Sequence, residues 1–239
     1  MFFSTIRAFF SSFMGWNCPI CGGAPFDGED SHFCAECMRS FRFVRNPVCP
    51  SCGGELSGIL QICPDCLHAG RKFPWRKAAA VFIMDGFVKD VIYRFKYRNQ
   101  PELARVFGYL AAGACRSAGI HADLIVPVPL HWVRYLQRGF NQSELLSEEI
   151  GKNLKIPVRS ILRRKKWTGQ QAKLNRDARI QNLSGAFAIS GSTNCKGWCI
   201  LLVDDVMTTG STLAEAARVL LDSGAEEVNI LVLARRQRN

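Results

Sequence analysis

Two adjacent carboxylates, Asp204 and Asp205, end an apolar run and are followed by a turn rich in hydroxyl groups. The turn contains Thr208, Thr209, Gly210, Ser211 and Thr212. The apolar run is typical of a buried parallel strand, and the helix predicted after the turn, over residues 213–221, begins with unpaired backbone N–H groups and the positive end of its dipole. Because the hydroxyl groups add donors and the glycine permits close approach of the backbone, this turn suits a phosphate group.

The two carboxylates would repel a bare phosphate, so they need a separate explanation. They fit a ligand whose vicinal ribose hydroxyls donate hydrogen bonds to them, or a Mg²⁺ ion that bridges to substrate phosphates. The alternative is a strand that ends in two solvated acids and is followed by a capped helix. The pattern favours a phosphorylated sugar.

The string from Leu201 to Leu213 also resembles the phosphoribosyl pyrophosphate (PRPP) signature of type I phosphoribosyltransferases, in which an apolar strand and two acids precede Thr-Thr-Gly-x-Thr. The resemblance implies that Asp204 and Asp205 hold the ribose hydroxyls with or near Mg²⁺. It also implies that residues 208–212 bind the 5-phosphate of PRPP. No lysine follows the glycine, so the Walker pattern is absent.

A second loop is predicted between an apolar strand that ends near Val128-Pro129 and the helix that starts at Asn141-Gln142. Its two arginines, Arg134 and Arg138, carry planar guanidinium groups that suit phosphate oxygens. These features predict a loop that faces pyrophosphate. The alternative is a solvated loop that ends in an asparagine cap.

Residues 163–187 form a long polar segment that is rich in lysine and arginine. A structureless stretch of this length inside a compact domain is usually functional or disordered. We expect it to close over an anionic ligand or to lie along nucleic acid. Trp167, among the cations, suits stacking on a base, with a core or ligand-free surface position as the alternative.

Eight of the eleven cysteines form four CxxC pairs, which are Cys18/Cys21, Cys34/Cys37, Cys49/Cys52 and Cys63/Cys66. This spacing lets both sulfurs of a pair face one metal, and two pairs complete the tetrahedral four-sulfur site of structural zinc. Such a site leaves no open position for a catalytic water, so both Zn²⁺ ions are predicted to be structural. The region has few large aliphatic residues, and zinc binding should supply its folding energy.

Alternatives remain for the cysteine region. Sequential pairing is favoured over a cross-braced arrangement because each half repeats the same knuckle and closes a short loop. Disulfides would need an oxidising compartment, for which no targeting signal is present, and an iron–sulfur cluster fits four paired knuckles less well.

The rest of the chain alternates strand and helix patterns. Strands are predicted over residues 78–84, 123–128, 185–189, 198–203 and 228–233, and helices over 87–97, 102–118 and 141–154. This alternation predicts an α/β fold with a mainly parallel sheet, helices on both faces and ligands at the carboxyl ends of the strands.

The domain order follows from these patterns. An amphipathic helix over 1–16 is expected to pack on the protein, with contact to a membrane surface as the alternative. A double zinc ribbon follows over 17–70, then a linker over 71–77 and the α/β domain over 78–239. The chain has 239 residues and a net charge of +11, which favours anionic partners. It has no transmembrane run and no targeting signal, so a cytoplasmic location is expected.

Taken in order, these stretches resemble the ComF/GntX family, which joins a cysteine zinc module to a type I phosphoribosyltransferase-like domain. The matching stretches are the CxxC series, Phe95-Lys96-Tyr97, residues 126–130, residues 138–142, Thr168, Gln171, Leu174, Arg179, Asn182, Phe187 and the Asp204-Asp205 signature.

Several roles follow from the family resemblance alone. It implies that Pro129, Arg138, Asn141 and Gln142 belong to a pyrophosphate loop and that Gln171 and Arg179 belong to a flexible loop. It implies a role in natural competence or in DNA uptake and utilisation, with single-stranded DNA, competence proteins or recombination proteins as partners. An active Mg²⁺-dependent transferase that uses an unidentified base or nucleotide acceptor is the alternative function.

Overall fold

The computed structural model describes residues 17–23, 33–56, 58–68, 70, 73–98, 100–165, 185–191 and 193–237. The predicted helix over 1–16 lies outside the described residues. Most of the polar segment does so too, including Trp167, Gln171 and Arg179.

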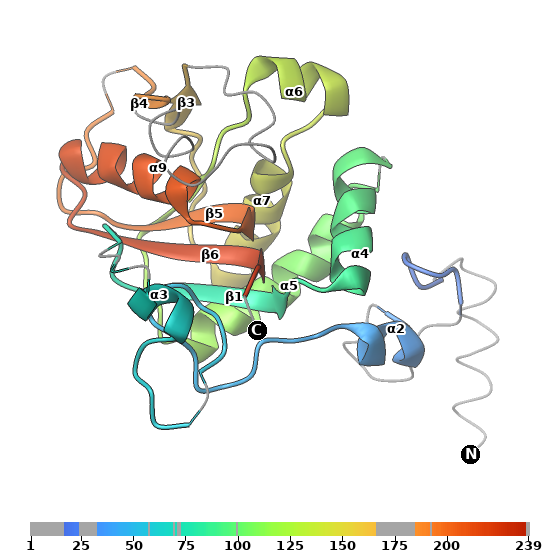
Figure 1. The fold of residues 1–239 in the computed structure, drawn as a ribbon. Helices are drawn as coiled ribbons and strands as arrows, with labels where there is room; N and C mark the ends of the chain where they lie inside the picture. Colours follow the sequence, from blue (N-terminus) through green and yellow to red (C-terminus); the bar gives the residue numbers. More distant parts are fainter. Residues whose placement is uncertain are drawn as a thin grey trace.

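A four-stranded parallel sheet forms the centre of the fold (Figure 1). Its order is β1 (Ala78–Ile83), β6 (Glu227–Arg235), β5 (Cys199–Met207) and β2 (Leu124–Pro127). Every residue of β1 and β2 is buried, which explains why their sequences are continuous apolar runs without alternation. The parallel sheet predicted from the sequence is therefore confirmed.

Helices cover both faces of this sheet (Figure 1). Helices α5 (Leu103–Ser117) and α7 (Gln142–Leu154) pack together on one face, and α9 (Ser211–Asp222) packs on the other. Helix α4 (Gly86–Tyr97) begins with Asp85, whose carboxylate accepts a hydrogen bond from the Val88 N–H at 2.8 Å. None of the helices in the described ranges has the length and apolar character that a membrane span needs.

Two predicted elements differ from the structure. The strand expected at 185–189 is β4 (Phe187–Ile189), which pairs antiparallel with β3 (Leu162–Arg164) in a separate two-stranded sheet. The predicted pyrophosphate loop contains a helix, α6 (Trp132–Arg138), which none of the predicted elements includes. Trp132, Tyr135 and Leu136 have helical spacing, but α6 has only seven residues and none of them is buried, so a stripe this short gave too weak a signal for a helix.

The cysteine-rich region docks along the edge of the sheet. It contains α2 (Ala35–Ser40) and α3 (Pro64–His68). The segment between them pairs antiparallel with β1, because the Val44 N–H donates to the Val81 carbonyl at 2.9 Å and the Ile83 N–H donates to the Arg42 carbonyl at 2.8 Å. These bonds cover the outer edge of β1, which would otherwise expose unpaired backbone groups.

Aromatic rings strengthen the same contact. Phe41 stacks on the fully buried Phe82 of β1 at a centroid distance of 4.6 Å, and Phe33 lies 6.2 Å from Phe107 of α5. Aromatic side chains bury large apolar areas and favour such offset or tilted arrangements. The first half of the cysteine-rich region therefore shares a hydrophobic core with α4, α5 and β1.

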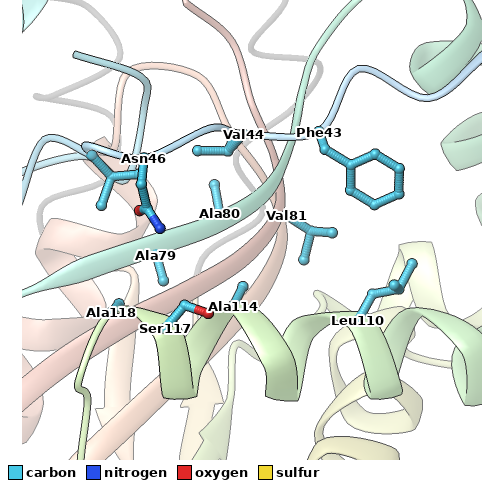
Figure 2. Close-up of a pocket in the computed structure, with 11 residues that line it drawn as sticks. Phe43, Val44, Asn46, Ala79, Ala80, Val81, Leu110, Ala114, Ser117 and Ala118 are labelled. Atoms are coloured by element: carbon cyan, nitrogen blue, oxygen red, sulfur yellow. The ribbon is translucent and has the colours of Figure 1, made fainter. Parts of the chain in front are cut away.

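A small cavity remains where this region meets the sheet (Figure 2). Its volume is about 180 Å³, and Figure 2 shows Phe43, Val44 and Asn46 on one side and α5 on the other, with β1 between them. None of the residues proposed from the sequence as ligand contacts lines it.

The contact between α5 and α7 can be tested at one glycine. A Cβ atom at Gly108 would lie 3.1 Å from the carbonyl carbon of Glu149 and closer still to its Cβ. We therefore expect Gly108→Ala to lower the free energy of unfolding by about 1–3 kcal/mol through overpacking. Urea denaturation followed by circular dichroism measures this change.

Gly113 of the same helix is the matched control, since an added Cβ there meets nothing within 4 Å. Gly113→Ala should leave the protein equally stable or raise its stability by up to about 1 kcal/mol, through helix propensity. Equal destabilisation by the two substitutions would contradict the proposed close contact between α5 and α7.

Candidate functional site

The acid pair lies near the carboxyl end of β5, which continues past the predicted end at residue 203 to Met207. The carboxylate of Asp204 accepts a hydrogen bond from the Ser143 hydroxyl at 3.0 Å, and its Oδ1 also accepts the backbone N–H of Asp205 at 2.9 Å. Ser143 is a buried residue in the first turn of α7. The start of this helix therefore holds the first acid in place.

The second acid forms an ion pair with a lysine from another element. Lys96, near the end of α4, donates to Asp205 Oδ1 at 2.8 Å, and their side chains are only 19% and 12% exposed. A charge pair that is so far removed from water is weakly screened, and removing one partner would leave the other charge uncompensated. Lys96 therefore provides a counter-charge for the acid pair.

Two carboxylates so close together do not ionise independently. Burial raises the pKa of Asp204 to about 7, and the charge of Asp205 contributes in the same direction. Lys96, the Asp205 N–H and the Ser143 hydroxyl act against these effects and lower the pKa. Asp204 can thus change its protonation state near neutral pH.

The hydroxyl-rich turn, residues 208–212, follows β5 at once and leads into α9. We call it the phosphate turn. Gly210 is the N-cap of α9 with a left-handed φ of 76° and has no side chain that could cap the helix. The Thr209 and Ser211 hydroxyls lie 3.0 Å apart, and the Ser211 N–H donates to Thr209 Oγ1 at 3.4 Å. A helix start with a glycine N-cap beside two hydroxyls gives the arrangement of backbone and side-chain donors that binds anions.

The start of α7 carries two predicted residues, Asn141 and Gln142, into the same region. Asn141 caps the helix: its Oδ1 accepts the Ser143 N–H at 3.1 Å, and its amide donates to the Val128 carbonyl at 3.1 Å. Gln142 is fully buried, accepts a hydrogen bond from Arg138 at 2.8 Å and donates to the Lys96 carbonyl at 3.4 Å. The asparagine cap, which was part of the sequence-based alternative to a pyrophosphate loop, is therefore present.

Arg138 links α6 to the end of α4. Its Nη2 donates to the Tyr97 hydroxyl at 2.7 Å, and its guanidinium lies 4.6 Å from the centre of the Tyr97 ring. Through its bonds to Gln142 and Tyr97, Arg138 connects the predicted loop with the end of α4, next to Lys96. Pro129 is only partly buried, just after the end of β2.

Lys96 and Ser143 belong to the site but were not predicted as contacts from the sequence. Arg164 also lies at the site, and it belongs to the polar segment 163–187 that we expected to close over an anionic ligand. Lys96 stood in a matching motif without an assigned role, and Ser143 had no distinguishing signal. Arg164 of β3 is in electrostatic contact with the acids: burial and Arg134 lower its pKa, whereas Asp204 raises it. Only the tertiary structure brings these side chains to the acid pair.

The eight paired cysteines form two clusters. Cys18, Cys21, Cys34 and Cys37 form one cluster, and Cys49, Cys52, Cys63 and Cys66 form the other. In each cluster the four Sγ atoms lie within 4.8 Å of one another, so the sequential pairing expected from the sequence is the one that the structure adopts.

Both clusters suit structural zinc, because each offers four thiol ligands and leaves no coordination position open for water. Backbone N–H groups approach the sulfurs, as from Gly23 to Cys21 Sγ at 3.4 Å and from Cys63 to Cys49 Sγ at 3.5 Å. Such outer contacts stabilise thiolates that bind a metal.

Two family models match the sequence. The phosphoribosyl transferase domain model matches residues 96–239, and the double zinc ribbon domain model matches residues 9–67. The first match begins at Lys96 and includes the acid pair and the phosphate turn.

Several characterised proteins are similar over most of their length. Competence protein F of Haemophilus influenzae is 34% identical over 231 residues, which are 94% of this chain and 99% of that protein. The DNA utilization protein YhgH of Escherichia coli K12 is 33% identical, with 84% of this chain and 89% of that protein covered. Competence protein ComFC of Bacillus subtilis is 28% identical, with 86% and 85% covered.

The raised pKa of Asp204 predicts a pH-dependent stability. The folded protein holds this proton more tightly than the unfolded chain, so the resulting stability is complete below the ordinary pKa of 3.8 and is lost as the pH rises through about 7. Asp204→Asn should therefore gain stability relative to the wild type between pH 5.5 and 7, by up to about 1.4 kcal/mol per pH unit. Urea denaturation at several pH values measures this difference.

Asp222→Asn, at the exposed end of α9, is the control and should show no such trend. A stability difference between Asp204→Asn and the wild type that stays constant from pH 5.5 to 8.5 would contradict the raised pKa.

Proposed function

The chain belongs to the family of competence protein F and the DNA utilization proteins, with a double zinc ribbon and a phosphoribosyltransferase domain, and from this premise we propose that it binds PRPP or a related phosphorylated ribose. The observation that carries the proposal is the position of the acid pair and the phosphate turn on one strand end. Asp204 and Asp205 would accept the ribose hydroxyls, and residues 208–212 would bind the 5-phosphate.

The geometry supports this assignment in two ways. The acids are held in place by Ser143 and Lys96, so little ordering is needed when a ligand arrives. The glycine-capped start of α9 and the hydroxyls of Thr209 and Ser211 lie directly after the same strand. A sugar phosphate could therefore bridge acceptors and donors that one rigid element positions.

Mg²⁺ is the metal that suits such a ligand. Its preferred ligands are oxygens, and it is usually bound by one or two carboxylates together with substrate phosphates. Asp204 and Asp205 are the carboxylates that would take part, and Mg²⁺ would neutralise charge on the pyrophosphate. Arg134 and Arg138 would face the pyrophosphate, and Gln171 and Arg179 would meet it from the polar segment.

A titration of PRPP, with and without Mg²⁺, tests the pocket. Hydrogen bonds to charged groups contribute about 1.5–3 kcal/mol each, so Asp204→Asn/Asp205→Asn should weaken PRPP binding at least ~10-fold. Isothermal titration calorimetry measures the affinity. If only the phosphate were recognised, removing two negative charges would strengthen binding instead.

The matched control carries the same change of charge away from the site. Asp90 of α4 and Asp222 of α9 are both exposed, so Asp90→Asn/Asp222→Asn should bind PRPP as the wild type does. Equal PRPP affinity of the wild type and the Asp204→Asn/Asp205→Asn variant would refute the assignment of the acid pair.

An active Mg²⁺-dependent phosphoribosyltransferase that uses a base or nucleotide acceptor is the alternative. The observation in its favour is the pKa of Asp204, which burial and Asp205 raise to about 7, since a carboxyl group that titrates near neutral pH is suited to accept a proton. The remaining residues would act by positioning and by stabilising charge.

We further propose that the protein acts in natural competence or DNA utilisation and binds single-stranded DNA on an aromatic surface of α4 and α6. We use this name for the exposed rings of Tyr93 and Tyr97 on α4 and of Trp132 and Tyr135 on α6, which are 53%, 54%, 65% and 48% exposed. The contact between Arg138 and Tyr97 links the two helices. Tyr93 and Tyr97 lie 4.9 Å apart, and the guanidinium of Arg138 covers Tyr97. Exposed rings beside cations are the pattern on which successive bases stack.

Substitution of the rings tests the aromatic surface. Stacking contributes about 1–3 kcal/mol per base, so Trp132→Ala/Tyr135→Ala should weaken binding of an oligo-dT probe at least ~5-fold. Fluorescence anisotropy at several salt concentrations measures this, and binding of the wild type should fall as salt rises through counterion release.

Tyr109→Ala is the control because Tyr109 is 38% exposed on α5, outside the aromatic surface. It should leave the oligo-dT affinity unchanged. An oligo-dT affinity that survives loss of both Trp132 and Tyr135 would exclude this surface as the binding site.

A further inference from the structure

The second zinc ribbon, residues 49–66, is joined to the phosphate turn by a buried arginine. Arg235 is the last residue of β6 and is 6% exposed. Its Nη1 donates to the Thr208 carbonyl at 2.7 Å and to the Met207 carbonyl at 3.4 Å. Its Nη2 lies 3.9 Å from Oδ2 of Asp65, which stands between the zinc ligands Cys63 and Cys66. Arg235 therefore connects the ribbon with the backbone at the start of the turn.

Aromatic rings make a second connection. Trp75 is 6% exposed, and its indole N–H donates to the carbonyl of Ser51, between Cys49 and Cys52, at 2.9 Å. Its ring stacks on Phe73 at a centroid distance of 4.2 Å. A Cβ atom added at Gly210 would lie 3.0 Å from the Phe73 ring and 3.2 Å from the Trp75 ring. The two rings thus pack directly against the turn.

The ribbon is itself fixed to the sheet. A Cβ atom added at Gly53 would lie 2.8 Å from the backbone of Ala79, and the Ala78 N–H donates to the Pro50 carbonyl at 2.8 Å. Glu55 and Gln237 exchange two hydrogen bonds, of 3.1 Å and 3.0 Å. The four cysteines of this cluster share one hydrophobic core with Trp75, Met207 and Leu213.

The first zinc ribbon contacts a different part of the molecule. Arg94 of α4 donates to the Ile20 carbonyl at 2.6 Å, and Gln100 donates to the Pro19 carbonyl at 3.4 Å. Three of its cysteines, Cys18, Cys34 and Cys37, belong to the core that includes Phe95 and Phe107, on the other face of the sheet. Arg235 and Trp75 therefore connect the phosphate turn with the second ribbon.

We propose that the second zinc ribbon holds the phosphate turn in its binding conformation, so that zinc at Cys49, Cys52, Cys63 and Cys66 controls the affinity of the turn for phosphorylated ligands. Zinc supplies the folding energy of such a small module, so its loss releases Asp65 and the Ser51 carbonyl. Arg235 and Trp75 then lose their partners in the ribbon. Ordering of the turn on ligand binding would then cost part of the binding free energy. Arg235 is a positioning residue, since it acts on the ligand through the turn. The identity of the ligand as a phosphorylated ribose rests on the proposed function.

Removal of one ligand from each cluster tests the coupling. Cys66→Ser and Cys37→Ser should each reduce zinc content from two ions to one, as measured by mass spectrometry of the metal. Hydrogen–deuterium exchange of the backbone at 207–213 should accelerate at least tenfold in Cys66→Ser and stay unchanged in Cys37→Ser. PRPP affinity, measured in the presence of Mg²⁺, should fall at least tenfold in Cys66→Ser alone.

A milder variant separates the connection from unfolding of the ribbon. Asp65→Asn keeps all eight cysteines, so it should retain both zinc ions while exchange at 207–213 accelerates. Asp90→Asn, an equal change of charge at an exposed site on α4, is its control and should leave exchange unchanged.

Equal exchange at 207–213 in Cys66→Ser and Cys37→Ser, whether fast or slow in both, would overturn the proposed coupling. Unchanged exchange in Asp65→Asn would overturn the part assigned to Arg235. If the wild type binds no PRPP, the proposed function is wrong, and the exchange measurement still decides whether the second ribbon holds the turn.

Discussion

Two adjacent carboxylates near the carboxyl end of β5, Asp205 buried and Asp204 partly buried, are the constraint on which the site depends. Charges withdrawn from water must be paired or protonated. Lys96 from α4 supplies the counter-charge to Asp205, and the Ser143 hydroxyl and the Asp205 N–H satisfy Asp204. These contacts require α4 and the start of α7 to meet at the same strand end. The pair therefore determines which helices surround the site and leaves Asp204 able to titrate near neutral pH.

The zinc ribbons precede the phosphoribosyltransferase domain in the sequence and also pack against its sheet. Backbone around Val44 covers the outer edge of β1, and Phe41 stacks on Phe82 in the core beneath it. On the opposite face, Trp75 and Arg235 connect the second cluster with the strand ends that carry the turn. Metal ligation thus replaces the large aliphatic core that the cysteine-rich region lacks, and it stabilises surfaces of the neighbouring domain.

Most of the fold follows from local patterns in the sequence. The strands of the parallel sheet are continuous apolar runs because both of their faces are covered, and the main helices have an apolar stripe. Helix α6 was missed because it has only seven residues, so the spacing of Trp132, Tyr135 and Leu136 is too short a pattern to distinguish a helix from a loop. These side chains are exposed, so the helix forms without a face in the core. Strand β4 was assigned to the wrong sheet because three residues do not reveal whether their partner is β3 or the central sheet.

The sequence by itself indicated the acid pair, the phosphate turn and the four CxxC pairs, because each depends on residues that are close together in the chain. It favoured sequential pairing of the cysteines, and the structure decided between this and a cross-braced arrangement. Only the tertiary structure decided that Lys96 neutralises Asp205, that Ser143 holds Asp204, and that Arg235 joins Asp65 to the turn. Ser143 and Asp204 are 61 positions apart in the chain, and Asp65 and Arg235 are 170 positions apart. Arg235 meets the turn because β6 and β5 are neighbours in the sheet. Contacts over such distances arise from packing of the sheet and its helices, and no local pattern of residues encodes them.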